Sequence, residues 1–132
     1  MPGQVCCAAV RKDTAAALCM TESLDTLLVI SDACGNARRM RRFSGFPGTL
    51  LLLDGVVLAA VQGCIHLVST ESLRLLRSIP VPGCAERMNV MDGALVFLDR
   101  LSETLYLLRG GCVIRLASDI RDFAPLEHIR RG

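Results

Sequence analysis

The sequence predicts an all-β fold of short antiparallel strands, and three observations carry this prediction. Most apolar runs are four to nine residues long, which is the length of a strand rather than of a helix. Turn-forming residues (Gly, Pro, Asp and Asn) separate these runs. Asp-Gly stands twice between apolar runs, at 54–55 and 92–93, and both residues tolerate the positive φ of a type I′ hairpin turn.

Each apolar run is expected to form one strand. Leu and Arg would also suit a helix near 71–77, but Pro80 and Pro82 follow at once, and proline stops a helix. A short helix is expected only in the tail, residues 121–132. In chain order, the runs are Val5–Val10, Ala15–Met20, Leu27–Ile30, Thr49–Leu53, Val56–Val61, Ile65–Val68, Leu73–Val81, Met88–Met91, Ala94–Leu98, Leu105–Leu108 and Cys112–Ala117.

The Asp-Gly hairpins belong to an internal repeat. Leu53–Ala60 aligns with Met91–Leu98, 38 positions later, and Leu24–Ser31 is a poorer copy. Each unit reads as four strands joined by turns, so residues 1–132 are expected to form a single domain of stacked units. Four short antiparallel strands are the content of one β-propeller blade. The approximate repeats are 15–46, 48–83 and 84–120.

One stretch carries a family resemblance. Residues 63–83, GCIHLVSTESLRLLRSIPVPG, resemble a repeat of the YVTN or quinoprotein-like β-propellers. The match extends over 48–120 and, more faintly, over 15–46. The WD40 family fits less well because the chain has no Trp. The resemblance implies a propeller-like fold, and it assigns no catalytic residue.

The length does not suit a closed propeller. Such rings usually have four or more blades, whereas 132 residues hold about three. The ring is therefore expected to be incomplete or to be completed by oligomerisation. Three arrangements are open: a piece of a longer propeller, an assembly of several chains, or an open stack whose edges attract partners.

Composition excludes several classes of protein. With 52% hydrophobic residues the chain can fill a core, so it is not intrinsically disordered. Its net charge of +2 does not favour nucleic acid, and no apolar run approaches the ~20 residues of a membrane-spanning helix. The seven cysteines are odd in number, lack a C-x-x-C pair and follow no secretory signal, which predicts reduced thiols in a cytoplasmic protein and no structural zinc.

Four arginines form the most charged segment. Arg38, Arg39, Arg41 and Arg42 lie within five residues and could grip phosphate groups. No aromatic residues alternate with them for base stacking, and on a strand they would point to opposite faces. A solvated or partner-contacting strand is the preferred interpretation, and binding of an anion or nucleic acid is the weaker one.

Two aspartates and a histidine are the other candidates. Asp54 and Asp92 occupy equivalent hairpin positions, where Asp beside Gly usually serves the turn but could also line a propeller channel as a metal ligand. His66 lies in an apolar strand, where a packed, hydrogen-bonded imidazole is more common than a catalytic one. No nucleotide, metal or catalytic-triad motif occurs, so no cofactor, metal or catalytic residue is expected.

These observations favour a non-catalytic repeat module for protein–protein interaction or self-association. The alternative is a hydrolase or lactonase-like enzyme that uses Asp54, Asp92 and His66 in a propeller channel. A weaker alternative is anion or nucleic-acid binding through Arg38–Arg42.

Overall fold

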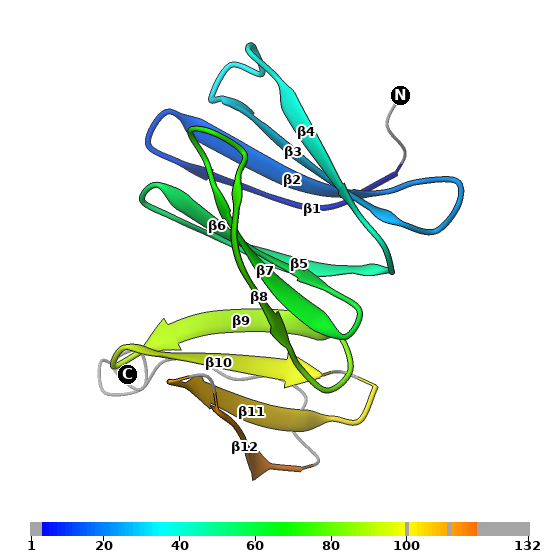
Figure 1. Cartoon of the computed structure of the whole chain (residues 1–132), viewed down its shortest axis with the longest axis vertical. Helices are drawn as coiled ribbons and strands as arrows, with labels where there is room; N and C mark the ends of the chain where they lie inside the picture. The colour runs from blue at the N-terminus through cyan, green and yellow to red at the C-terminus, as the bar shows by residue number, and fades with distance from the viewer. Residues whose placement is uncertain (1–3, 100, 111, 119–132) are drawn as a thin grey trace, which may run out of the picture.

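The computed structural model describes residues 4–99, 101–110 and 112–118, which contain twelve β-strands and no helix (Figure 1). The tail in which a helix is expected lies outside these residues. None of the described residues belongs to a helix able to cross a membrane. The strands are β1 Gln4–Arg11, β2 Thr14–Met20, β3 Thr26–Asp32, β4 Arg39–Phe43, β5 Pro47–Leu53, β6 Val56–Val61, β7 Cys64–Ser69, β8 Leu75–Pro80, β9 Ala85–Met91, β10 Ala94–Asp99, β11 Thr104–Arg109 and β12 Cys112–Ala117.

The strands form three four-stranded antiparallel sheets, each from four consecutive strands. The first sheet is β1–β4, the second β5–β8 and the third β9–β12. The all-β prediction of blade-like units is confirmed, and the three sheets do not close a ring. The first sheet begins with β1, ahead of the first expected repeat at 15–46.

Tight turns join the strands where the sequence predicts them. At 92–93 both Asp92 (φ 51°) and Gly93 (φ 76°) have the positive φ that a type I′ turn requires. At 54–55 only Gly55 does (φ 78°), so this hairpin is confirmed but its expected type is wrong. The Leu- and Arg-rich stretch before Pro80 forms β8 rather than a helix.

The sheets are stacked in sequence order, with the second between the other two (Figure 1). One apolar cluster lies between the first and second sheets, and another between the second and third. Because alternate residues of a strand point to opposite faces, β6 contributes Val57, Ala59 and Val61 to the first cluster and Leu58 and Ala60 to the second. This two-sided burial accounts for the unbroken apolar run 56–61.

The first strands of the three sheets run next to one another, with β5 in contact with both β1 and β9. The backbones of β5 and β9 approach so closely that a Cβ atom added at Gly48 would lie 2.1 Å from the carbonyl oxygen of Ala85. The spacing of the second and third sheets thus depends on a residue without a side chain.

Candidate functional site

The arginine segment forms β4 and the turn before it, and its side chains bind the protein's own backbone. Arg39 donates to the carbonyl oxygens of Thr70 and Glu71, and Arg41 donates to that of Leu73 (3.1 Å). These acceptors lie around the β7–β8 turn of the second sheet. Two of the four arginines therefore tie the first sheet to the second.

The other two arginines make local contacts. Arg42 forms an ion pair with Asp25 (Nη2–Oδ2, 2.9 Å), and it also donates to the hydroxyl of Ser23. Arg38 donates to the carbonyl oxygen of Gly35 (3.2 Å). The guanidinium groups thus point in several directions, with Arg39 and Arg41 on one face of β4 and Arg42 on the other. They do not present one continuous basic surface.

This arrangement predicts unequal effects for two neighbouring substitutions. Arg39→Ala removes charge-assisted bonds to two carbonyl groups between sheets and should lower the free energy of unfolding by about 1 kcal/mol. Arg38→Ala removes a single bond within one turn and should change it by less than about 0.5 kcal/mol. Urea denaturation of both variants measures the difference, and equal effects would contradict the bridging role of Arg39.

A hollow of about 500 Å³ lies beside these arginines. Two of its charged groups are engaged within the chain: Arg39 binds the carbonyl groups described above, and the Asp32 carboxylate accepts from the backbone N–H of Cys34 and Asn36. Arg39 and Asp32 are therefore bound by the chain itself rather than directed into the hollow as ligand-binding groups. Its lining residues are Asp13, Thr14, Ile30, Ser31, Asp32, Ala37, Arg38, Arg39, Thr70 and Glu71.

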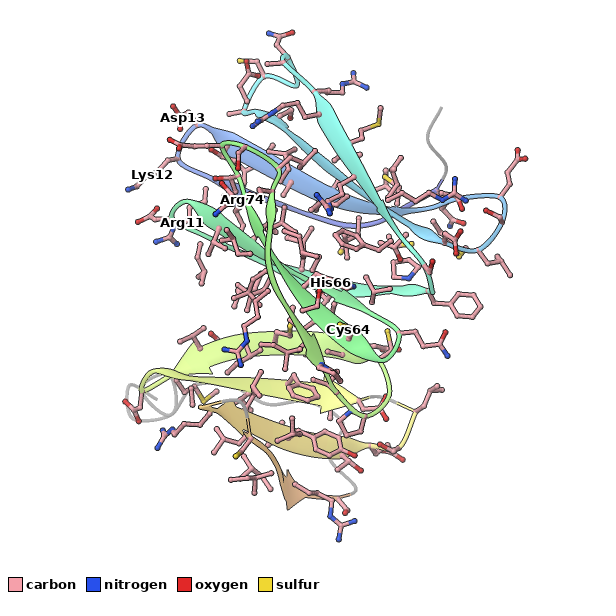
Figure 2. All side chains as sticks on the ribbon, in the orientation of Figure 1. Arg11, Lys12, Asp13, Cys64, His66 and Arg74 are labelled. Atoms are coloured by element: carbon pink, nitrogen blue, oxygen red, sulfur yellow. The ribbon has the colours of Figure 1, made fainter. Side chains whose placement is uncertain are left out.

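Asp54 lies in an exposed ion-pair cluster between two hairpins. Its carboxylate accepts from Arg11 Nε (2.9 Å) and lies 3.3 Å from Lys12 Nζ, and Figure 2 places both cations at the β1–β2 hairpin. Hydrogen bonds from these cations hold the pKa of Asp54 below its usual value. The carboxylate is ionised at neutral pH and is engaged in joining the hairpins of the first and second sheets.

Asp92 occupies the corresponding hairpin of the third sheet. It has a positive φ, and its carbonyl oxygen accepts from Arg109 Nη2 (3.4 Å). The described residues contain no group of three His, Cys, Asp or Glu side chains arranged to hold a metal ion. Asp54, Asp92 and His66 are therefore not brought together as a ligand set.

His66 lies between the first and second sheets. Its ring stacks on Phe43 of β4 with centroids 4.2 Å apart and planes 16° from parallel, and its Nδ1 lies 2.7 Å from Ser78 Oγ. Burial, assisted by the charge of Arg41, lowers the pKa of His66. The imidazole is therefore neutral at physiological pH.

Cys64 lies beside this histidine, with its Sγ 3.8 Å from Nδ1. Burial raises the pKa of the Cys64 thiol, so the sulfur remains protonated rather than becoming a nucleophilic thiolate. The same applies to Cys84, whose pKa burial and the charges of Glu86 and Asp99 raise to about 11. All seven cysteines lie in the described residues and are free thiols.

A different surface stands out, on the side of the first sheet that faces away from the second. Its central row crosses the sheet as Ala8, Ala17, Val29 and Met40, which lie directly opposite one another in register. None of these side chains belongs to either core cluster. We call this surface the outer face; it comprises Val5, Ala8, Val10, Ala15, Ala17, Cys19, Leu27, Val29 and Met40.

The outer face is apolar apart from Ser31 and Arg42 at its margins, and it is partly open to solvent. Val10, Val5 and Met40 are 66%, 58% and 54% exposed, and all three lie on its edge strands. Monomeric proteins seldom expose a contiguous apolar area of this kind unless a partner covers it. The sequence already indicates that both sides of this sheet are apolar. The strands β1 and β2 are apolar at nearly every position, as is typical of strands buried on both sides.

The comparisons with known proteins do not assign the chain to a family. No family model matches the chain, and a search of curated proteins finds no match. The resemblance to YVTN or quinoprotein-like repeats rests on the residues quoted above.

Proposed function

We propose that this chain is a β-propeller-like repeat module, similar in its repeats to the YVTN and quinoprotein-like propellers, that acts by protein–protein contact, including self-association. The outer face of the first sheet is the observation that carries the proposal. The polar candidates support it too, because Arg39, Arg41 and Asp54 are engaged within the chain rather than directed at a substrate.

Comparison of the three sheets explains why an uncovered outer face suggests a partner. In the second sheet the row equivalent to Ala8, Ala17 and Val29 is Leu50, Ala59 and His66, which the first sheet covers. In the third sheet it is Met88, Phe97 and Tyr106, which the second sheet covers. The equivalent face is therefore buried by a neighbouring sheet in the second and third sheets. In the first sheet no described sheet covers it.

A charge placed in the central row tests the proposal. We expect the wild-type chain to show a molar mass above that of one chain by light scattering, rising with concentration. Ala8→Glu should return it to a single chain, because association would bury an unpaired carboxylate. Circular dichroism establishes whether the variant is folded.

The matched control is Ala33→Glu, at an exposed position in the β3–β4 turn that is not part of the outer face. It should associate as the wild type does. A wild-type chain that stays monomeric at every concentration, or an Ala8→Glu variant that associates normally, would overturn association through this surface.

A further inference from the structure

One side of the third sheet is as well shielded as the surfaces inside the stack. We call the side of each sheet that faces along the stack, from the first sheet toward the third, its forward face. In the second sheet this face includes Leu58 and Ala60 of β6, which are 7% and 0% exposed because the third sheet covers them. The register equivalents in the third sheet are Val96 and Leu98 of β10, which are 5% and 0% exposed.

No described sheet covers Val96 and Leu98. They lie on the opposite side of β10 from Phe97, which packs on the second sheet. Neither of them belongs to either core cluster. Their burial therefore does not come from the stacking of the three described sheets.

Flanking strands alone do not shield a central strand to this degree. The outer face also has no described sheet upon it, and its central strands β2 and β3 have a strand on each side, as β10 does. Cys19 is shielded there, beside the bulge in β1, but the other apolar side chains of these two strands on that face remain partly exposed. They are Ala15, Ala17, Leu27 and Val29. The forward face of the third sheet thus has a cover that the described strands do not provide.

We propose that residues 119–132 bind the forward face of the third sheet and form its cap. These residues follow β12 in the sequence, and β12 is an edge strand of that sheet. Two strand spacings separate β12 from β10, about 10 Å, a distance that roughly three extended residues span. The segment of 14 residues is therefore long enough to reach β10 and to lie across it.

The sequence of this segment suits an apolar surface. Its large apolar residues recur at every third position, with charged residues between them. Side chains at positions i and i+3 share one side of a helix, which is the structure that the sequence predicts for most of this segment. One side of the segment can then cover Val96 and Leu98 while the charged residues remain in water. The recurring residues are Ile120, Phe123, Leu126 and Ile129.

A capped third sheet makes the stack one-sided. Each unit of a repeat protein leaves an apolar face for its neighbour, so a terminal unit needs a cover with a polar outer surface. Residues 119–132 provide that cover for the third sheet, whereas no described sheet covers the outer face of the first. The cap therefore leaves the outer face as the side on which a partner can bind, and it does not depend on what that partner is.

A tryptophan reporter tests the cap, because the chain has no Trp of its own. Phe123→Trp, in the full chain, should emit at a shorter wavelength when folded than when unfolded in urea, since its indole lies against the sheet. Leu101→Trp is the exposed control, at a turn residue that is 91% exposed. Acrylamide should quench the Phe123→Trp variant less than this control.

A second substitution identifies the surface to which the segment binds. Added to Phe123→Trp, Val96→Lys should shift the emission to that of the Leu101→Trp control, because the segment would otherwise bury an unpaired ammonium group. Ala17→Lys, on the second strand of the first sheet and on its outer face, is the matched control and should leave the emission unchanged. Circular dichroism establishes folding, and Leu107→Lys, opposite Val96 on β11, takes the place of Val96→Lys if that variant does not fold.

The outcomes separate this inference from the proposed function. A tryptophan that Val96→Lys exposes and Ala17→Lys leaves shielded supports the cap, even if the chain does not associate through its outer face. A tryptophan at position 123 that is as exposed as the control in the folded chain overturns the cap and leaves the proposed function standing. A tryptophan that Ala17→Lys exposes instead overturns both, because the segment would then occupy the outer face.

Discussion

Phe97→Ala should lower the free energy of unfolding by about 3–5 kcal/mol, the range observed when a large aromatic side chain is removed from a core. Phe97 is the largest of the fully buried side chains and is 0% exposed. It lies on β10 and faces the second sheet, where it packs in a cluster with Leu58, Ile65 and Ile79. Truncation leaves a cavity between the second and third sheets.

The neighbouring ring makes this cavity difficult to close. Tyr106, directly opposite on β11, stacks on Phe97 with centroids 5.2 Å apart and planes 21° from parallel. The rest of the cavity is lined by residues of both sheets, and the backbone contact of Gly48 with Ala85 prevents these sheets from moving closer together. We therefore expect little relaxation, and a loss toward the upper end of the range.

Urea denaturation followed by circular dichroism measures the effect. Phe46→Ala is the control, because Phe46 is 45% exposed in the segment between β4 and β5 and should cost less than about 1 kcal/mol. A loss in Phe97→Ala as small as that of the control would show that this side chain contributes little to the stability of the interface between the second and third sheets. The total stability of a domain of this size is about 5–15 kcal/mol, so the loss expected for the Phe97 variant is a large fraction of it.

The sequence predicts the hairpins better than it predicts the extent of the repeat. Asp92-Gly93 marks a turn because both residues adopt positive φ. The β1–β2 turn is formed by Lys12 and Asp13, without glycine, so it carries no comparable sequence signal although Lys12 has φ 55°. For this reason the first expected repeat starts at residue 15 and omits β1.

The role of β4 could not be predicted from composition. A strand of three arginines, one methionine and one phenylalanine resembles a solvated segment. In the structure Arg39 and Arg41 face the second sheet and donate to its backbone, while Phe43 stacks on His66. Which carbonyl groups a guanidinium reaches depends on how two sheets pack, and the sequence of one strand does not contain that information.

The outer face, too, depends on how the sheets pack and could not be predicted from the sequence of its strands alone. Alternation predicts that Ala8 and Ala17 lie on one side of the first sheet, and the strand register confirms that they are opposite one another. That no described sheet covers this side depends on the order of stacking. The uncovered face thus emerges only when the three sheets are placed together.

Gly48→Ala should destabilise the chain by about 3 kcal/mol, near the top of the range for overpacking, because the added methyl group meets backbone. Its Cβ atom would lie 2.1 Å from the Ala85 carbonyl oxygen and 2.9 Å from Cys84 Sγ. A flexible side chain could rotate away, but the Ala85 oxygen belongs to β9 and moves only with that strand. The second and third sheets must therefore separate locally to admit the methyl group.

Two further variants identify the cause. Gly110→Ala adds a methyl group in open space at φ 59°, so it should cost only about 1 kcal/mol from the strained backbone. Adding Cys84→Ala to Gly48→Ala removes the sulfur contact and retains the carbonyl contact, so it should restore little stability. Thermal unfolding of the three variants measures this order, and recovery in the double variant would assign the clash to the thiol. With the carbonyl contact as the cause, the close approach of β5 to β9 fixes the spacing at which the second and third sheets bury their shared cluster.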